Sequence, residues 1–265
     1  MDADPVRQKA ETFASLHTAG DPLILFNCWD VATAKLTARA FPAVAMSSGA
    51  VAMAQGFEDG EQIPLDLVVP LTARIAGAVD CPVSVDLEAG YSDDPLDVAR
   101  TVETLINNGI VGINLEDGLS QGKRALVAPD AHAKKIEAVR EAAERAGVPF
   151  FINARVDPFL LKIGDAQTCF DETLNRAAVY ASASASGIFV PFLFDMDLIA
   201  DLAARIALPL NILVMPTAAP VAALAEAGVA RVSCGGWPIE AFAKAFGAAA
   251  AAFADTKDYA SVFAS

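Results

Sequence analysis

The sequence predicts a (β/α)₈ barrel, because eight short apolar runs alternate with longer segments of helical period. The short runs are continuously apolar, which is typical of parallel strands that are covered on both faces. A length of 265 residues is close to the roughly 250 residues of one such barrel. We therefore expect residues 1–265 to form one barrel domain. A doubly wound open sheet has the same local pattern, and the count of eight favours the closed barrel.

The expected strands are rich in β-branched and aromatic residues and lie at 23–26, 43–46, 83–86, 112–115, 150–153, 187–190, 210–214 and 230–233. The helices expected between and after them lie at 31–40, 65–78, 95–108, 130–146, 168–182, 197–206, 218–227 and 238–254. Three of these helices are followed by a glycine, a common helix stop: Gly109, Gly147 and Gly228. We also expect a helix over residues 4–18, ahead of the first strand, and another in the tail after Asp255.

Composition and charge argue against several classes of function. Hydrophobic residues make up 54% of the chain, and the net charge is −14 with no long run of lysine or arginine, so no nucleic-acid partner is expected. No apolar run approaches the roughly 20 residues that span a bilayer, so no membrane association is expected. The N-terminus lacks the pattern of a secretory signal, which predicts a cytoplasmic protein. The four cysteines are widely spaced beside apolar runs and are expected to be reduced thiols.

Acidic side chains gather at the carboxyl ends of the predicted strands, which is where barrels of this kind have their active sites. Asp86 and Glu88 are two positions apart, so on an extended segment they would point the same way, and Glu116 ends the neighbouring strand. Three carboxylates together would raise one another's pKa values, and a divalent cation would relieve the repulsion. Oxygen-only ligands favour Mg²⁺ or Mn²⁺. Helix caps or rim salt bridges are the alternative role of these acids.

Arg155, at the end of the fifth predicted strand, suits a substrate carboxylate, because its planar guanidinium can bind a carboxylate with two hydrogen bonds. An ion pair with one of the acids is the alternative. Ser48 and Gly49 follow the second strand and could offer backbone N–H groups to the same anion, or form a tight turn. His17 and His132 fall on predicted helices away from the strand ends. Both are expected at the surface, so a histidine base is not expected.

Several of these segments resemble the isocitrate lyase/phosphoenolpyruvate mutase superfamily. The resemblance runs in order from about residue 20 to about residue 240, and it is carried by residues 46–50 (MSSGA), 56–59 (GFED), 85–91 (VDLEAGY), 112–117 (GINLED) and 153–155 (NAR). It implies a Mg²⁺-dependent barrel that acts on 2-oxo or 2-hydroxy acids. Members of the superfamily break or form C–C or P–C bonds through enolate-like species, whose charge a metal ion stabilises.

The resemblance also implies roles for particular residues. Asp86 would ligate the metal ion, while three further acids would hold it directly or through its waters, namely Asp59, Glu88 and Glu116. The substrate would contact Asp86, the Arg155 side chain and the backbone of Ser48, Gly49 and Ala50.

The loop after Glu116 departs from the superfamily pattern. The lyases carry a catalytic cysteine there, between basic residues and a glycine–histidine pair, whereas residues 117–126 read DGLSQGKRAL. The mutases and phosphonopyruvate hydrolases have a longer loop with a lysine, and Lys123 is the lysine available for that catalytic role. Residues 190–192 (VPF) stand where the mutases have histidine and serine, and Met46 replaces an aromatic residue. Orthodox isocitrate lyase activity is therefore not expected.

Three functions stay open at this level. The first is a Mg²⁺-dependent lyase or decarboxylase acting on an oxaloacetate-like or 2-methylmalate-like acid, the chemistry that survives the missing cysteine. The second is a phosphonomutase or phosphonopyruvate hydrolase, for which Lys123 or Arg124 would supply the cation. The third is a barrel that binds a metabolite or metal without turnover, which the short loop favours and the retained acids oppose. The resemblance also implies a homo-oligomer, a dimer or a tetramer with C-terminal helix exchange, in which residues 241–254 could be exchanged or could cap their own barrel.

Overall fold

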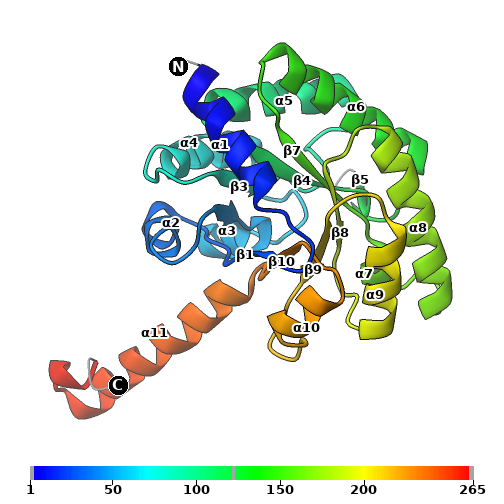
Figure 1. The fold of residues 1–265 in the computed structure, drawn as a ribbon. Coiled ribbons are helices and arrows are strands. Elements are labelled where there is room, and N and C mark those ends of the chain that lie inside the picture. Colours follow the sequence, from blue (N-terminus) through cyan, green and yellow to red (C-terminus); the bar gives the residue numbers. More distant parts are fainter. Residues whose placement is uncertain (1–2, 121–122, 263–265) are drawn as a thin grey trace.

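A computed structural model describes residues 3–120 and 123–262, and it confirms the predicted fold class (Figure 1). In these residues eight parallel strands form one sheet in the order β1-β10-β9-β8-β7-β4-β3-β2. The sheet nearly closes into a barrel through an isolated bridge between Cys28 and Met46. The strands are β1 Leu23–Leu25, β2 Val44–Met46, β3 Val83–Asp86, β4 Gly112–Glu116, β7 Phe151–Arg155, β8 Gly187–Val190, β9 Leu210–Leu213 and β10 Arg231–Ser233.

Helices alternate with the strands and surround the barrel (Figure 1). All eight predicted helices are present, and their ends differ from the prediction by a few residues. They are α2 Val31–Thr37, α4 Leu65–Ala76, α5 Pro95–Asn107, α6 Pro129–Arg145, α8 Ala166–Ser182, α9 Met196–Arg205, α10 Val221–Glu226 and α11 Trp237–Thr256. The glycines expected to follow three helices have positive φ angles of +89°, +69° and +89°, which glycine adopts without strain: Gly109, Gly147 and Gly228.

The predicted N-terminal helix is α1, Ala3–Ser15, and it covers the end of the barrel where the strands begin. Its Phe13 is fully buried, and the ring packs edge-on against Phe151, the first residue of β7, with 5.6 Å between ring centroids. The burial of one face of α1 against the barrel explains why this helix forms ahead of the first strand.

The helix α3, the hairpin of β5 and β6 and the helix α7 were not predicted, and the tail forms a 3₁₀ helix. The helix α3, Ser48–Gln55, follows β2 directly, and the side chain of Ser47 caps it by accepting a hydrogen bond from Ala50 N at 3.3 Å. Ser48 and Gly49 therefore begin a helix rather than a tight turn. The hairpin of β5, Leu119–Ser120, and β6, Lys123–Arg124, follows β4. The others are the helix α7, Pro158–Leu161, and the 3₁₀ helix η1, Tyr259–Val262, which occupies the tail where a helix was expected.

The helix α11 leads away from the barrel to the C-terminus (Figure 1). Several of its large apolar side chains are exposed, namely Trp237, Phe242, Phe246 and Phe253. No helix in the described part of the chain combines the length and hydrophobicity needed to cross a membrane.

Candidate active site

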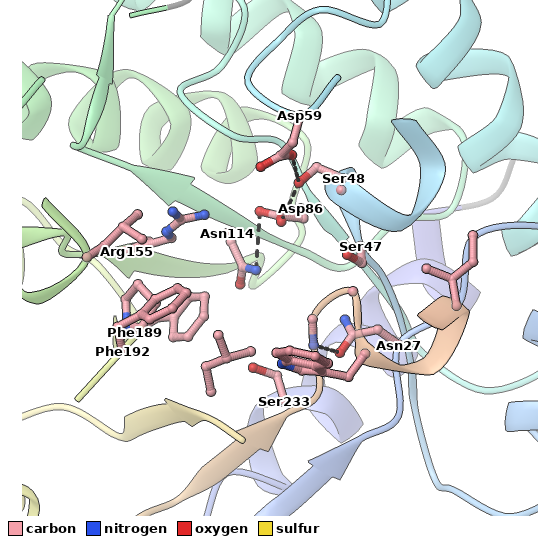
Figure 2. A pocket seen from close by; sticks show the side chains of 18 of the residues that line it. Asn27, Ser47, Ser48, Asp59, Asp86, Asn114, Arg155, Phe189, Phe192 and Ser233 are labelled. Carbon is pink, nitrogen blue, oxygen red and sulfur yellow. Dashed lines mark hydrogen bonds between the residues drawn. The ribbon is translucent and has the colours of Figure 1, made fainter. Parts of the chain in front are cut away.

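The carboxyl ends of the strands surround a cavity of about 590 Å³ (Figure 2). This volume lies within the range of roughly 300–1,000 Å³ that is typical of small-molecule pockets. Five of the predicted site residues line the cavity: Ser48, Gly49, Asp59, Asp86 and Arg155. Four others are not part of the lining: Ala50, Glu88, Glu116 and Lys123.

Asp86 ends β3 and faces the cavity beside Ser48 and Asp59 (Figure 2). Its Oδ2 accepts a hydrogen bond from Ser48 Oγ at 2.8 Å, and its Oδ1 lies 3.4 Å from the donor Asn114 Nδ2. The Ser48 hydroxyl also lies 3.3 Å from Asp59 Oδ1. One hydroxyl therefore sits between two carboxylates, and both of these carboxylates line the cavity.

The amide of Asn114 is oriented by the polar interior of the barrel. Asn114 Oδ1 accepts hydrogen bonds from Asn153 Nδ2 at 2.9 Å and from Arg231 Nη2 at 3.1 Å. Because the oxygen faces these donors, the amide N–H groups face Asp86. The sheet register supports this arrangement, since Asp86 pairs with Asn114 and Asn114 pairs with Asn153.

Glu116 ends β4 and lies between two arginines. Its side chain is only 1% exposed, and its Oε1 accepts a hydrogen bond from Arg124 Nη1 at 2.7 Å, while its Oε2 pairs with Arg155 Nη1. Arg124 Nη2 also reaches Asp59 Oδ2 at 2.8 Å. Burial raises the pKa of Glu116, and the two guanidinium groups oppose that rise. Arg124, on the hairpin, thus holds two of the acids that were predicted to bind metal.

Arg155 ends β7 and forms ion pairs with two acids. An ion pair was the alternative role that the sequence analysis gave for this residue. Besides Glu116, it binds the buried Asp157, with 2.8 Å between Nε and Oδ1. Burial disfavours the charged guanidinium, but the carboxylates of Asp157 and Glu116 outweigh it and raise the pKa of Arg155. Arg155 still lines the cavity, so it stays positively charged at a place where a substrate anion could reach it.

Glu88 is turned away from the cavity lining. The strand β3 ends at Asp86, and Glu88 has a φ of +52°, so the side-chain alternation of an extended segment does not reach it. Its Oε2 accepts a hydrogen bond from Glu61 N at 2.7 Å, and its Oε1 lies 3.3 Å from the Tyr91 hydroxyl. Burial raises the pKa of Glu88 to about 7, helped by the negative charges of Asp59 and Asp86. Negative charge at this end of the barrel is therefore incompletely balanced.

The donor set suits a hard divalent cation, although the side chains are not gathered around one point. In residues 3–120 and 123–262, no three acidic, histidine or cysteine side chains lie close enough together to hold a metal ion. The oxygen donors near the cavity, which include Asp59, Asp86 and Asn114, are nevertheless those that Mg²⁺ prefers. Asp59 and Glu116 would become available to such an ion only if Arg124 released them.

Two features of the cavity lining differ from the prediction: the basic residue of the hairpin that lines it, and the presence of aromatic side chains. Arg124 lines the cavity and its neighbour Lys123 does not, although both are exposed. The two residues differ because successive side chains of the hairpin strand point to opposite faces. Two aromatic side chains also line the cavity: Phe189 lies in β8, the sixth strand of the barrel, and Phe192 follows that strand. Neither was predicted as a site residue.

The expectation that both histidines lie at the surface is wrong. His132 is fully buried on the inner face of α6, with its ring 4.8 Å from that of Tyr180, and the ring of His17 stacks on Phe151 at 3.9 Å. Burial lowers the pKa of each histidine to about 3. Neither lines the cavity, so a histidine base remains unsupported there.

The fold and the cavity define a (β/α)₈ barrel protein with a small-molecule site at the carboxyl ends of its strands. The family model described as phosphoenolpyruvate phosphomutase matches residues 13–254, and the chain belongs to this family, within the isocitrate lyase/phosphoenolpyruvate mutase superfamily. A structure described as a putative phosphonomutase from Burkholderia cenocepacia is 45% identical, with a TM-score of 0.87, and the match covers 91% of this chain and 98% of that chain.

Curated relatives agree with this assignment. An uncharacterized protein of Mycobacterium tuberculosis is 37% identical over 245 residues, which is 92% of this chain and 89% of the relative. The 2-methylisocitrate lyase of Escherichia coli is 27% identical, with 88% of this chain and 79% of the lyase covered. More distantly, a phosphonopyruvate hydrolase structure in complex with oxalate and Mg²⁺ is 23% identical with a TM-score of 0.78, over 94% of this chain and 87% of that chain. The named relatives include a lyase and a structure described as a putative phosphonomutase, and the family model is that of a mutase, which suggests an enzyme.

Proposed function

We propose that the protein is a Mg²⁺-dependent lyase or decarboxylase that acts on a small 2-oxo or 2-hydroxy mono- or dicarboxylic acid through an enolate-like intermediate, with Mn²⁺ as a possible substitute. The observation that carries the proposal is the position and hydrogen bonding of the Asp86 carboxylate. This carboxylate faces the cavity, and its hydrogen bonds within the described chain come from two neutral groups, Ser48 Oγ and Asn114 Nδ2. A cavity-facing carboxylate oriented by neutral donors keeps its charge available for a cation.

In this proposal Asp86 would ligate the metal ion, and Asp59, Glu88 and Glu116 would hold it directly or through its waters. When bound, Mg²⁺ would supply positive charge that stabilises the negative charge developing on an enolate-like intermediate. Asn114 fixes the orientation of Asp86 through its amide group.

The substrate carboxylate would be bound at the start of α3 and by Arg155. The first residues of α3, Ser48 and Gly49, line the cavity, and the N–H groups at a helix start attract an anion. The N–H of Ala50, which was expected to join them, donates to the Ser47 side chain instead. Arg155 adds a fixed positive charge from β7, on the cavity side of its ion pairs. Decarboxylation requires stabilisation of the enolate rather than a protein acid at the cleaved bond, so it is compatible with a loop that has no cysteine after Glu116.

A phosphonomutase or phosphonopyruvate hydrolase is the second candidate, and the position of Arg124 favours it. A phosphonyl group needs a cation in addition to the metal, and Arg124 lines the cavity on the hairpin after β4. The 45% identical structure described as a putative phosphonomutase also supports this candidate. A barrel that binds its ligand without turnover is the third, and the shortness of the hairpin supports it.

The proposed assembly is a homo-oligomer, a dimer or tetramer, in which α11 packs on a second copy of the chain. The exposed Phe242 and Phe246 stack on each other, with 6.1 Å between ring centroids, on a helix that leads away from its own barrel. The cytoplasmic location expected from the sequence stays a prediction.

An activity assay distinguishes the three candidates. The protein is incubated with oxaloacetate, 2-methylmalate or phosphonopyruvate, in Mg²⁺ or in EDTA, and CO₂, pyruvate and phosphate are measured. Asp86→Asn protein in the same Mg²⁺ buffer is the control, because Mg²⁺ alone promotes loss of CO₂ from oxaloacetate. We expect Asp86-dependent release of CO₂ or pyruvate. From phosphonopyruvate, release of phosphate together with pyruvate would favour a hydrolase and formation of phosphoenolpyruvate would favour a mutase, which are the two forms of the second candidate. Tight binding with none of these products would favour the third.

A further inference from the structure

Three neighbouring segments at the rim of the cavity carry short polar side chains. Ser233 ends β10, Asn27 follows β1 and Ser47 follows β2, and all three line the cavity. The strand β1 pairs with β10, and the isolated bridge between Cys28 and Met46 joins the segment after β1 to β2. The three residues are therefore neighbours around the barrel, and Figure 2 shows Asn27 between Ser47 and Ser233. Here they are called the donor cluster.

The amide of Asn27 is fixed in place while its donor end is unused. Asn27 Oδ1 accepts hydrogen bonds from Cys234 N and Gly235 N, both at 2.9 Å. Because the oxygen is held by these two groups, the amide nitrogen is the end that is left for a ligand. Asn27 is only 6% exposed, and within residues 3–120 and 123–262 its Nδ2 donates no hydrogen bond. A buried and oriented donor without an acceptor at a cavity indicates a site for an acceptor group of a ligand.

The two serines of the donor cluster also have hydrogens to give. Ser47 Oγ accepts a hydrogen bond from Ala50 N at 3.3 Å, and Ser233 Oγ accepts one from Asn211 Nδ2 at 3.2 Å. Each serine is 4% exposed, and neither hydroxyl donates a hydrogen bond to the described part of the chain. The cluster thus offers two O–H hydrogens besides the two N–H hydrogens of Asn27. This number matches the roughly four lone-pair sites of one carboxylate.

A buried positive charge lies beneath the donor cluster. Arg231 is two positions before Ser233 on β10, so the two side chains leave the same face of the strand about 7 Å apart. Arg231 is 1% exposed; it donates to the neutral Asn114 Oδ1 at 3.1 Å, while its Nε and Nη1 have no partner in the described chain. Burial lowers the pKa of Arg231 to about 9, and the carboxylate of Asp86 opposes this. A cation bound at Asp86 would weaken that support, and an anion above Arg231 would replace it.

We propose that the donor cluster binds the second carboxylate of a dicarboxylic 2-oxo or 2-hydroxy acid, while the first carboxylate lies at the start of α3 and at Arg155. This inference rests on the proposed function and narrows its substrate class to diacids. The indole nitrogen of Trp237, which lines the same part of the cavity, is a further neutral donor. Glu240 lines the cavity as well, but it is exposed, so water screens its repulsion of a carboxylate.

Neutral donors suit a carboxylate that the reaction removes. In the decarboxylation of a 2-oxo diacid, the bond between the second carboxyl carbon and its neighbouring carbon breaks, the electron pair moves into the enolate, and CO₂ leaves. A proton from water then converts the enolate to the shorter 2-oxo acid. An arginine paired with the second carboxylate would stabilise the charged substrate more than the neutral CO₂ and would so raise the barrier. Hydrogen bonds from neutral groups hold the carboxylate with less of this cost.

Binding of three 2-hydroxy acids tests the proposal. Titration calorimetry in Mg²⁺ compares malate, its 4-amide and 2-hydroxy-4-methylpentanoate, with oxalate as the reference ligand. None of these compounds has the 2-oxo group next to a removable carboxylate that decarboxylation requires. The three hydroxy acids have similar shapes, and they differ in whether the far end is a carboxylate, an amide or a pair of methyl groups. We expect malate to bind at least about tenfold more tightly than either counterpart, because its far end alone presents only acceptors.

Asn27→Asp is the sharpest variant, because it keeps the oxygen that accepts from Cys234 N and Gly235 N and replaces the donor by a charged oxygen. We expect it to lower the affinity for malate relative to oxalate at least about thirtyfold, and to make the 4-amide the tighter ligand of the two. Ser233→Ala removes one donor and should lower the same ratio about threefold to tenfold. Asn175→Asp, an equal change of charge at an exposed position of α8, is the control and should change the ratio less than about twofold.

Oxalate binding shows that each variant is folded and separates the possible failures. If oxalate binds but malate binds no better than its 4-amide or its apolar counterpart, the donor cluster does not bind a carboxylate, and the proposed function stands. Equal effects of Asn27→Asp and Asn175→Asp would overturn the inference in the same way. If neither oxalate nor any hydroxy acid binds in Mg²⁺, the proposed function fails, and this inference fails with it.

Discussion

The two ends of the barrel use charged and aromatic residues in opposite ways. At the amino end, α1 closes the barrel with the buried ring of Phe13, and the stacked ring of His17 is kept neutral by burial. At the carboxyl end, acids and arginines surround an open cavity, and Glu88 and Phe192 have positive φ angles. The amino end is therefore closed by aromatic packing around the buried Arg231, whereas the carboxyl end leaves clustered carboxylates and a strained backbone beside a cavity that a ligand could fill.

The two ends of β3 give the largest expected contrast. Asp86→Asn removes the negative charge that faces the cavity but keeps the shape of the side chain, so we expect Mg²⁺-dependent turnover to fall by about 10³-fold or more with little change in melting temperature. Asp80→Asn, at an exposed position just before the same strand, is the control and should leave both quantities unchanged. Turnover retained in Asp86→Asn would contradict the assignment of the site.

The amino end should respond in the reverse manner. Phe13→Ala removes a fully buried ring, so we expect the free energy of unfolding to fall by about 3–5 kcal/mol, with kcat of the folded protein nearly unchanged. Phe192→Ala removes an exposed ring and should change unfolding by about 0.5 kcal/mol or less. Denaturant unfolding of both variants measures this difference. A loss of kcat in folded Phe13→Ala protein would show that the two ends are coupled.

Buried acids and buried histidines should differ in the pH dependence of stability, and Glu88 at the carboxyl end and His17 at the amino end test this difference. Burial raises the pKa of the Glu88 carboxyl group to about 7, so the folded state binds the proton of this group more tightly than the unfolded state does. The protonated carboxyl group therefore contributes stability that is complete below pH 4.5 and is lost as the pH rises to about 7. Burial lowers the pKa of His17 to about 3, so the unfolded state binds its proton first, and stability is lost as pH falls from 6.5 towards 3. The effect amounts to about 3 kcal/mol at most for Glu88 and about 5 kcal/mol at most for His17.

Melting temperatures of the metal-free protein between pH 4 and pH 8 test these opposite slopes. Glu88→Gln should remove most of the loss between pH 4.5 and pH 7, and His17→Phe, which keeps an aromatic ring on Phe151, should reduce the loss below pH 6.5. If either variant follows the wild-type profile, the group it replaces has an ordinary pKa in the folded protein.

Most of the barrel could be predicted from the sequence because its signals are local. Eight apolar runs and the glycines after the helices depend on neighbouring residues alone. The short helix α3 was missed because residues 48–55 are apolar or small throughout and carry no charged face that would show a helical period. The hairpin was missed because each of its strands has two residues, which is too few for a pattern.

The composition of the site could be predicted better than its geometry. The ends of the strands identified Asp86 and Arg155 correctly as residues near one cavity. The orientation of Glu88 depends on a left-handed backbone position that the strand pattern does not contain. The pairing of Arg124 with Asp59 joins residues 65 positions apart, and the choice of Arg124 over Lys123 depends on which face of the hairpin meets the cavity.

The ion pairs of Arg124 give the smallest predicted effect, and they test whether the carboxyl end is poised for a cation. Arg124 is 34% exposed, and its bonds to Asp59 and Glu116 must be released before those acids can bind metal, so they weaken Mg²⁺ binding by a modest amount. We expect Arg124→Ala to lower the Kd for Mg²⁺ about threefold to tenfold in calorimetry without substrate. Lys123→Ala, which removes the neighbouring exposed charge, is the control and should change this Kd less than twofold.

Equal effects of the two substitutions would mean that the overall positive charge of the hairpin, rather than competition for two carboxylates, sets the affinity for Mg²⁺. Weaker Mg²⁺ binding in Arg124→Ala would mean that the arginine organises the acids for the metal instead of occupying their place.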